Sequence, residues 1–127
     1  IFATCAEIIG VSLPDHAGED SVSFLNCLLG KQVGPFREAS VQQSGKKALA
    51  IRKGKWKLIV HGDNRRELFD LKTDIGEANN AIHSNPEVAA ELASLLQSYL
   101  DRGRSTSGKA QPLDYKISLD EVRFKKK

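Results

Sequence analysis

The sequence is poor in sulfur: it has no methionine and only two cysteines among 127 residues. Neither cysteine belongs to a C-x-x-C pair or a Cys/His cluster, so neither a zinc site nor a disulfide scaffold is expected. Cys5 and Cys27 lie in apolar surroundings, which predicts two buried free thiols, although spacing leaves a pairing open. Because the chain begins with Ile1 rather than Met, we expect it to be a piece of a longer protein.

Long apolar runs and a strong net charge are also lacking. No stretch is long enough to cross a bilayer, and no secretory signal is visible. The formal net charge is +3, and part of the excess lies in Lys125–Lys127, so no polyanionic partner is implied. The hydrophobic share of 40% and charged share of 28% predict one ordinary globular domain with a small core.

Motifs for common chemistries are absent as well. The chain has no glycine-rich phosphate loop and no G-x-S-x-G elbow. His16, His61 and His83 are far apart in the sequence and lie in or beside predicted turns, which favours surface residues over a catalytic base.

The N-terminal region predicts two short helices. The first runs over Ile1–Ile9 and stops at Gly10, and the second is capped by Asp20 or Ser21 and ends at Gly30. The apolar side of the first helix comprises Ile1, Phe2, Cys5, Ile8 and Ile9.

Strand patterns follow. We expect strands over Phe36–Gln43, Ala48–Lys53, Lys55–His61 and Glu67–Leu71, with a tight hairpin at Gly54 and the last strand at an edge.

Trp56 in a basic strand raises the question of nucleic-acid binding. Trp56 alternates in phase with Leu58 and Val60, which predicts a core tryptophan and a solvated lysine face instead. The basic set in question is Lys46, Lys47, Arg52, Lys53, Lys55, Lys57, Arg65 and Arg66.

An acidic loop follows the last strand. Asp70, Asp74 and Glu77 offer oxygens that would suit calcium or magnesium, but their spacing does not match an EF-hand loop. The pattern favours carboxylates that cap backbone amides, with Gly76 supplying an unusual backbone angle.

A long amphipathic helix closes the pattern. It starts with a capping box of Ser84 and Glu87, or with Asn85 as cap and Pro86 in the first turn, and it ends at Gly103. Its apolar stripe comprises Val88, Leu92, Leu95, Leu96, Tyr99 and Leu100. The sum predicts an α+β fold: about four antiparallel strands packed by a C-terminal helix, with helices at the N-terminus.

Four segments in order carry a family resemblance. AIRKGKWKLI at 50–59 and ELFDLKTDIGEANN at 67–80 resemble the C-terminal subdomain of the sulfatase family, the arylsulfatase-like hydrolases of sulfate esters. ATCAEIIGVSLPDHAGEDSVSFL at 3–25 resembles the segment before it, and GRSTSGKAQP at 103–112 resembles the tail of bacterial members. Phe69, Ile75, Ala81 and Ser107 stand where the family more often has Tyr, Pro, Leu and Pro.

The resemblance implies a bacterial sulfatase fragment without its N-terminal catalytic domain. Residues 1–34 would end the preceding helical region, 35–103 would form the C-terminal subdomain, and 104–127 would be a polar tail. In the family, catalysis uses calcium and a formylglycine made from Cys or Ser in C/S-x-P-x-R. That motif is absent, so we assign no catalytic or metal residue and no cofactor here. The tail could dock loosely through Ile117, Leu119, Val122 and Phe124.

The resemblance also implies partners and a location. These are the N-terminal domain, a sulfated carbohydrate or aryl substrate, and the periplasm or the exterior of the cell. In the family the loop at 42–46 can approach the substrate, which makes Gln43, Ser44 and Lys46 candidate substrate contacts, with a solvated hairpin as the alternative.

A stand-alone interaction module or split-gene relic remains open, with a small nucleic-acid binder behind it. An exposed apolar patch that includes part of Ile1–Ile9 would favour the fragment.

Overall fold

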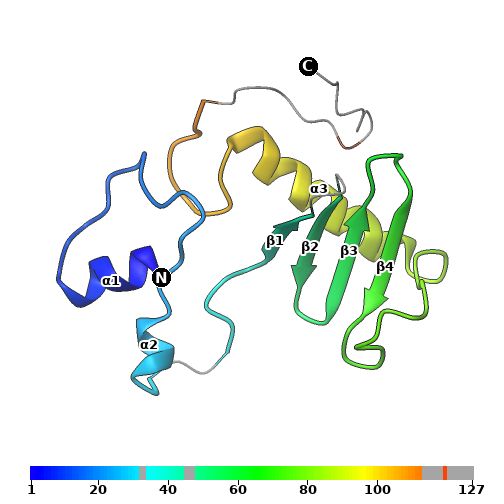
Figure 1. Ribbon diagram of the computed structural model, residues 1–127, viewed down its shortest axis with the longest axis horizontal. Helices are drawn as coiled ribbons and strands as arrows, with labels where there is room; N and C mark the ends of the chain where they lie inside the picture. Colours follow the sequence, from blue (N-terminus) through cyan, green and yellow to red (C-terminus); the bar gives the residue numbers. More distant parts are fainter. Residues whose placement is uncertain (32–33, 45–47, 113–118, 120–127) are drawn as a thin grey trace.

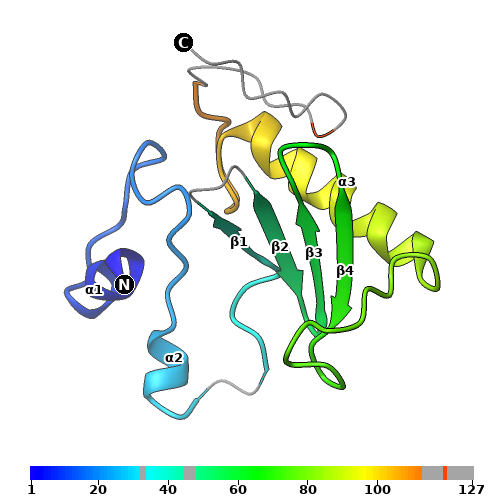
Figure 2. The ribbon, with the colours of Figure 1, turned by 45° about the vertical axis from the view of Figure 1, so that its right-hand side comes forward.

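The structure is a computed structural model, and it describes residues 1–31, 34–44, 48–112 and 119. The elements are α1 (Phe2–Ile8), α2 (Leu25–Leu28), β1 (Ser40–Gln43), β2 (Leu49–Lys53), β3 (Trp56–Val60), β4 (Arg66–Asp70) and α3 (Pro86–Arg102). Four antiparallel strands form one open sheet in the order β1-β2-β3-β4, and α3 lies across one face (Figure 1). In Figure 2, α1 and α2 lie beyond the β1 edge. The predicted α+β class is confirmed.

Two tight turns join the last three strands. Gly54 and Lys55 form the loop between β2 and β3, and Gly54 has a φ of 58°, a conformation that costs glycine little. At the next turn the His61 N–H donates to the Arg65 carbonyl (2.9 Å), and Asn64 has a φ of 66°. The predicted hairpin and the predicted edge position of β4 are both confirmed.

β1 is shorter than the sequence predicted. A strand from Phe36 is wrong, because pairing with β2 begins only at Ser40. The preceding residues contact the N-terminal region instead: the Phe36 ring lies 6.0 Å from the Phe24 ring, centroid to centroid. In addition, Arg37 Nη2 donates to the Asp20 carbonyl (2.8 Å).

The core lies between the sheet and α3. Ile51, Leu58 and Leu68 sit side by side on adjacent strands, and each is fully buried. They join Leu92 and Leu96 of α3 in one apolar cluster. Burying a side chain of this size stabilises the fold by about 1.5–3 kcal/mol, so this layer dominates the stability.

Trp56 packs against the rim of this core, as predicted, although it is only partly buried. The neighbouring cations are occupied by carboxylates. Lys55 Nζ lies 2.6 Å from Asp70 Oδ2, and Lys57 Nζ lies 2.7 Å from Glu77 Oε1. These pairs reduce the free positive charge beside the tryptophan.

The boundaries of α3 follow the sequence. Asn85 is the N-cap, Pro86 begins the helix, and Gly103 ends it in the left-handed region with a φ of 64°. The predicted side-chain cap does not form, because Asn85 Nδ2 donates to the Ala81 carbonyl (3.2 Å).

Only one residue of the loosely docked tail segment falls within the described part. Leu119 is buried, and its N–H donates to Gln97 Oε1 (2.8 Å). Ile117, Val122 and Phe124 lie outside the described residues. Across the described ranges, no helix is both long and apolar enough to cross a bilayer.

The N-terminal helices differ in how well the sequence predicted them. α1 agrees with the prediction, whereas α2 begins later and is a single short turn. The predicted cap by Asp20 or Ser21 is wrong, because both side chains bond to other segments. Ser21 Oγ accepts from the Ala3 N–H (2.9 Å), and Asp20 Oδ1 accepts from the Ser105 N–H (2.8 Å).

Candidate functional site

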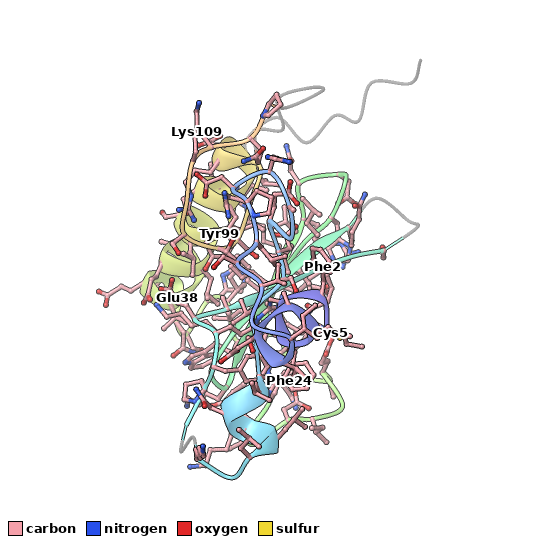
Figure 3. All side chains as sticks on the ribbon, turned by 90° about the vertical axis from the view of Figure 1, so that its left-hand side faces the viewer. Phe2, Cys5, Phe24, Glu38, Tyr99 and Lys109 are labelled. Carbon is pink, nitrogen blue, oxygen red and sulfur yellow. The ribbon has the colours of Figure 1, made fainter. Side chains whose placement is uncertain are left out.

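The most unusual surface of the molecule is apolar and lies on α1, α2 and the segments beside them. Figure 3 views the protein from this side, with Phe2 and Cys5 on α1 and Phe24 next to α2. Ile1 is 82% exposed and Ile9 is 72% exposed, so the stripe of α1 faces outward. We call the following set the N-terminal apolar surface: Ile1, Phe2, Cys5, Ile8, Ile9, Val11, Leu28, Leu29 and Phe36.

Exposed large apolar side chains scattered singly are ordinary, but a concentration on neighbouring segments marks an interaction surface. The predicted apolar patch is therefore confirmed. A hollow continues it between the start of α1 and the 18–24 segment, and its walls include Phe2, Phe24 and Phe36.

The two cysteines lie on α1 and α2, and the prediction of buried thiols is wrong. Cys5 and Cys27 are both free and exposed. The reason lies in the small residues of α1: Thr4 and Ala6 are the buried ones. Thr4 Oγ1 accepts from the Phe24 N–H (3.2 Å), so the chain before α2 covers the small side of the helix and leaves the large side open.

The loop between β1 and β2 carries the sequence-predicted substrate contacts. Gln43 ends the edge strand β1 and is exposed. Ser44, also exposed, closes the hairpin: its N–H donates to the Ala48 carbonyl (2.9 Å), and its Oγ accepts from the Ala48 N–H (3.4 Å). Lys46 lies outside the described residues. A substrate contact by these residues stays a prediction.

The acidic loop caps its own backbone. Asp74 accepts from the N–H of Asn79 (2.8 Å) and of Ala78 (3.1 Å), and these bonds lower the pKa of its carboxyl. The prediction of an unusual angle at Gly76 is wrong: the positive φ, 54°, falls one residue later at Glu77.

Calcium does not fit this part of the chain. Over the described residues, no three His, Cys, Asp or Glu side chains are grouped so that they could hold a metal ion. Neither cysteine sits in the C-x-P-x-R context from which, by the sulfatase resemblance, formylglycine would be made.

A buried arginine is the feature that the sequence reasoning missed. Arg104 is 6% exposed, and its Nη1 donates to the carbonyls of Asp15 and Lys109, at 3.0 Å each. Its Nε and Nη2 donate to Thr106 Oγ1 at 3.3 and 3.0 Å. The only sequence signal is the G-R-S-T-S-G run, which does not itself indicate burial.

No family model matches the chain, so the comparison rests on individual relatives and solved structures. The N-acetylgalactosamine-6-O-sulfatase of Bacteroides thetaiotaomicron is 38% identical over 117 residues, covering 80% of this chain and 23% of that protein. A solved structure from work on the metabolism of multiple glycosaminoglycans by the same species is 40% identical, with a TM-score of 0.69. It covers 77% of this chain and 23% of its own. This chain matches a C-terminal portion of the sulfatase family.

A further solved structure, of a protein in complex with its substrate D-glucosamine-2-N,6-O-disulfate, is 25% identical with a TM-score of 0.63. It covers 75% of this chain and 22% of its own. The chain therefore spans about a quarter of the length of the sulfatases it matches. The sulfatase resemblance predicted from the AIRKGKWKLI and ELFDLKTDIGEANN segments is confirmed.

Proposed function

We propose that this chain is the C-terminal portion of a sulfatase that hydrolyses sulfate esters of a sulfated carbohydrate. We further propose that the N-terminal apolar surface packs against the larger portion of that enzyme. Two observations support the proposal: the 38% identity to an N-acetylgalactosamine-6-O-sulfatase, and the exposure of large apolar side chains on α1 and α2. Each Å² of apolar surface removed from water contributes about 25 cal/mol, which would drive such packing.

In this proposal the chemistry is divided between the two portions. The remaining portion would supply the formylglycine nucleophile and the calcium site, for which the described part of this chain offers no suitable ligands. This chain would form one wall of the substrate cleft, with the β1–β2 loop held on a rigid sheet. We therefore expect the isolated chain to lack sulfatase activity, with or without calcium.

The proposed substrate is a sulfated amino sugar, in line with the name of the 38% identical relative. Gln43 and Ser44 would offer hydrogen bonds to sugar hydroxyls, and Lys46 would offer a positive charge to a sulfate group. The resemblance further suggests a location in the periplasm or outside the cell.

A chimera tests the proposal. The aligned C-terminal region of the Bacteroides thetaiotaomicron N-acetylgalactosamine-6-O-sulfatase is replaced by this chain, and hydrolysis of 6-O-sulfated N-acetylgalactosamine is measured. We expect a folded chimera with measurable turnover, and no turnover by the isolated chain or by the relative truncated at the same junction. Turnover by the isolated chain, or a folded chimera without activity, would overturn the proposal.

A matched pair of variants tests the docking surface. Ile9 is 72% exposed within the N-terminal apolar surface, and Ile75 is 86% exposed in the acidic loop. Ile9→Asp would place a charge in the proposed interface, so we expect the chimera to lose most of its folded yield and activity. Ile75→Asp should leave both unchanged. If the chimera tolerates the two variants equally, the packing surface is elsewhere.

A further inference from the structure

The described elements form two packing groups. α3 packs on β2 and β3, and α1 packs on α2, but neither N-terminal helix makes extensive contact with the sheet or with α3. The orientation of the N-terminal apolar surface therefore depends on the segments that link the two groups. Figure 1 shows the segment after α3, drawn in orange, next to the loop between α1 and α2.

That segment is bonded to the loop at sequence-distant points. Thr106 donates twice to the Glu19 carbonyl, from its Oγ1 (2.6 Å) and from its N–H (3.3 Å). The Ser105 N–H donates to Asp20 Oδ1 (2.8 Å). These bonds join residues more than eighty positions apart, so they link the end of α3 to the N-terminal group.

The 15–21 loop is in turn bonded to α1. Ser21 Oγ accepts from the Ala3 N–H (2.9 Å), and a Cβ placed on Gly18 would lie 3.2 Å from the Phe2 ring. Any displacement of this loop would therefore move α1 and the apolar side chains that it carries.

Arg104 sits at the centre of this link. Its guanidinium bonds to Asp15 of the loop and to Lys109 and Thr106 of its own segment. Gly108 lies directly beside the guanidinium: a Cβ there would come 2.6 Å from Nη1, and the residue has a φ of 126°. A guanidinium spreads five donors over a rigid planar fork and so reaches acceptors on different sides, whereas a lysine carries its three donors on a single nitrogen.

We propose that Arg104 is a positioning residue that fixes the N-terminal apolar surface relative to the sheet and α3. The role in docking rests on the proposed function, because a catalytic portion would then meet a surface of defined orientation. The link itself joins residues of this chain only, so it can be tested without the catalytic portion.

Amide hydrogen exchange on the full chain tests the link, with Arg104→Lys and Thr106→Val as the variants. We expect exchange to become about tenfold faster at amides of the N-terminal group, such as Ile9 and Leu28. Exchange at Leu58 and Leu68 in the sheet should stay unchanged. Thr106→Val keeps the side-chain shape and removes the hydroxyl, so its effect is readable even if Arg104→Lys unfolds the chain.

Ser105→Ala is the control, since it leaves the backbone donor to Asp20 in place, and we expect wild-type exchange. Equal loss of protection in the sheet and in α1 would show Arg104 to be an ordinary stability residue and overturn the proposal. Unchanged exchange in both variants would also overturn it.

The chimera tests the role of the link in docking. In the chimera, Thr106→Val should lower folded yield and activity. If the parent chimera itself fails to fold or to act, that failure would count against the proposed function and would leave the exchange result intact.

Discussion

The Tyr99 hydroxyl donates to Glu38 Oε2 across 3.3 Å, while Lys53 Nζ lies 3.2 Å from the other oxygen of the same carboxylate. One glutamate before β1 thus connects the end of α3 to the last residue of β2 (Figure 3 labels Glu38 and Tyr99). Lys53 continues the chain of contacts to Glu91 on α3 (2.9 Å). The segment that leads into the edge strand β1 is therefore connected to α3 by polar contacts as well as through the sheet.

Removing the tyrosine hydroxyl should weaken this connection. We expect Tyr99→Phe to lower the free energy of unfolding by about 1 kcal/mol at pH 7, because one partly buried hydrogen bond is lost. Burial, followed by the charge of Glu38, raises the pKa of Tyr99. A group with a raised pKa contributes stability that is complete below the unfolded value of about 10 and is lost as the pH rises through the folded value.

Urea unfolding of both proteins between pH 7 and 11 measures this effect. The wild type should lose stability above pH 10 more steeply than Tyr99→Phe, so that the gap between them narrows. Parallel pH profiles of the two proteins would contradict a raised pKa of Tyr99 in the folded state.

The stabilisation that Asp74 contributes should depend on pH in the opposite direction, with its loss at low pH. Hydrogen bonds from the backbone of Asn79 and then Ala78 lower the pKa of Asp74, so its stabilisation is present above the ordinary aspartate value and is lost as the pH falls through the lowered one. We expect Asp74→Asn to have a lower melting temperature than wild type at pH 7 and the same one at strongly acidic pH. Glu7→Gln, on the exposed surface of α1, is the control. A constant difference at all pH values would contradict this origin.

The sequence predicted the sheet and α3 well because their patterns are local. Alternation in β3, the glycine of the hairpin and the asparagine-proline start of α3 each specify their own surroundings. The sequence failed where a residue's partner is distant in the chain. Asp20 looked like a helix cap but bonds to Ser105, and Arg104 looked like part of a polar tail but is buried against Asp15.

The burial of Cys5 on α1 was predicted wrongly for a different reason. Helical periodicity predicts an apolar face and implies burial, but it does not say what covers that face. Within the described residues of this chain, Ile8 and Ile9 remain exposed. The substrate-contact candidates Gln43 and Ser44 came from the resemblance alone, since an exposed hairpin loop carries no periodic signal.

A buried apolar side chain of α3 and an exposed one beside α1 should respond differently to truncation. Leu96 is fully buried and Ile9 is 72% exposed. We expect Leu96→Ala to cost about 2–5 kcal/mol in the isolated chain, and Ile9→Ala to cost less than about 0.5 kcal/mol. In the chimera, Ile9→Ala should become clearly destabilising, because the side chain would then be buried. Thermal unfolding of the isolated chain, its two variants, the chimera and the chimera with Ile9→Ala measures this. An unchanged effect of Ile9→Ala in the chimera would argue against docking through α1.

The exposed thiols provide a direct probe of the same surface. Cys5 lies on α1 within the N-terminal apolar surface, and Cys27 lies on α2. Because both are exposed, we expect iodoacetamide to alkylate both in the folded isolated chain without denaturant, at rates close to those in urea. In the chimera, Cys5 should react at least about tenfold more slowly, since a docked surface excludes the reagent. Mass spectrometry of the alkylated peptides measures each site separately. Protection of Cys5 already in the isolated chain would contradict its exposed position, and equal reaction in chain and chimera would place the docking contact away from this side of α1.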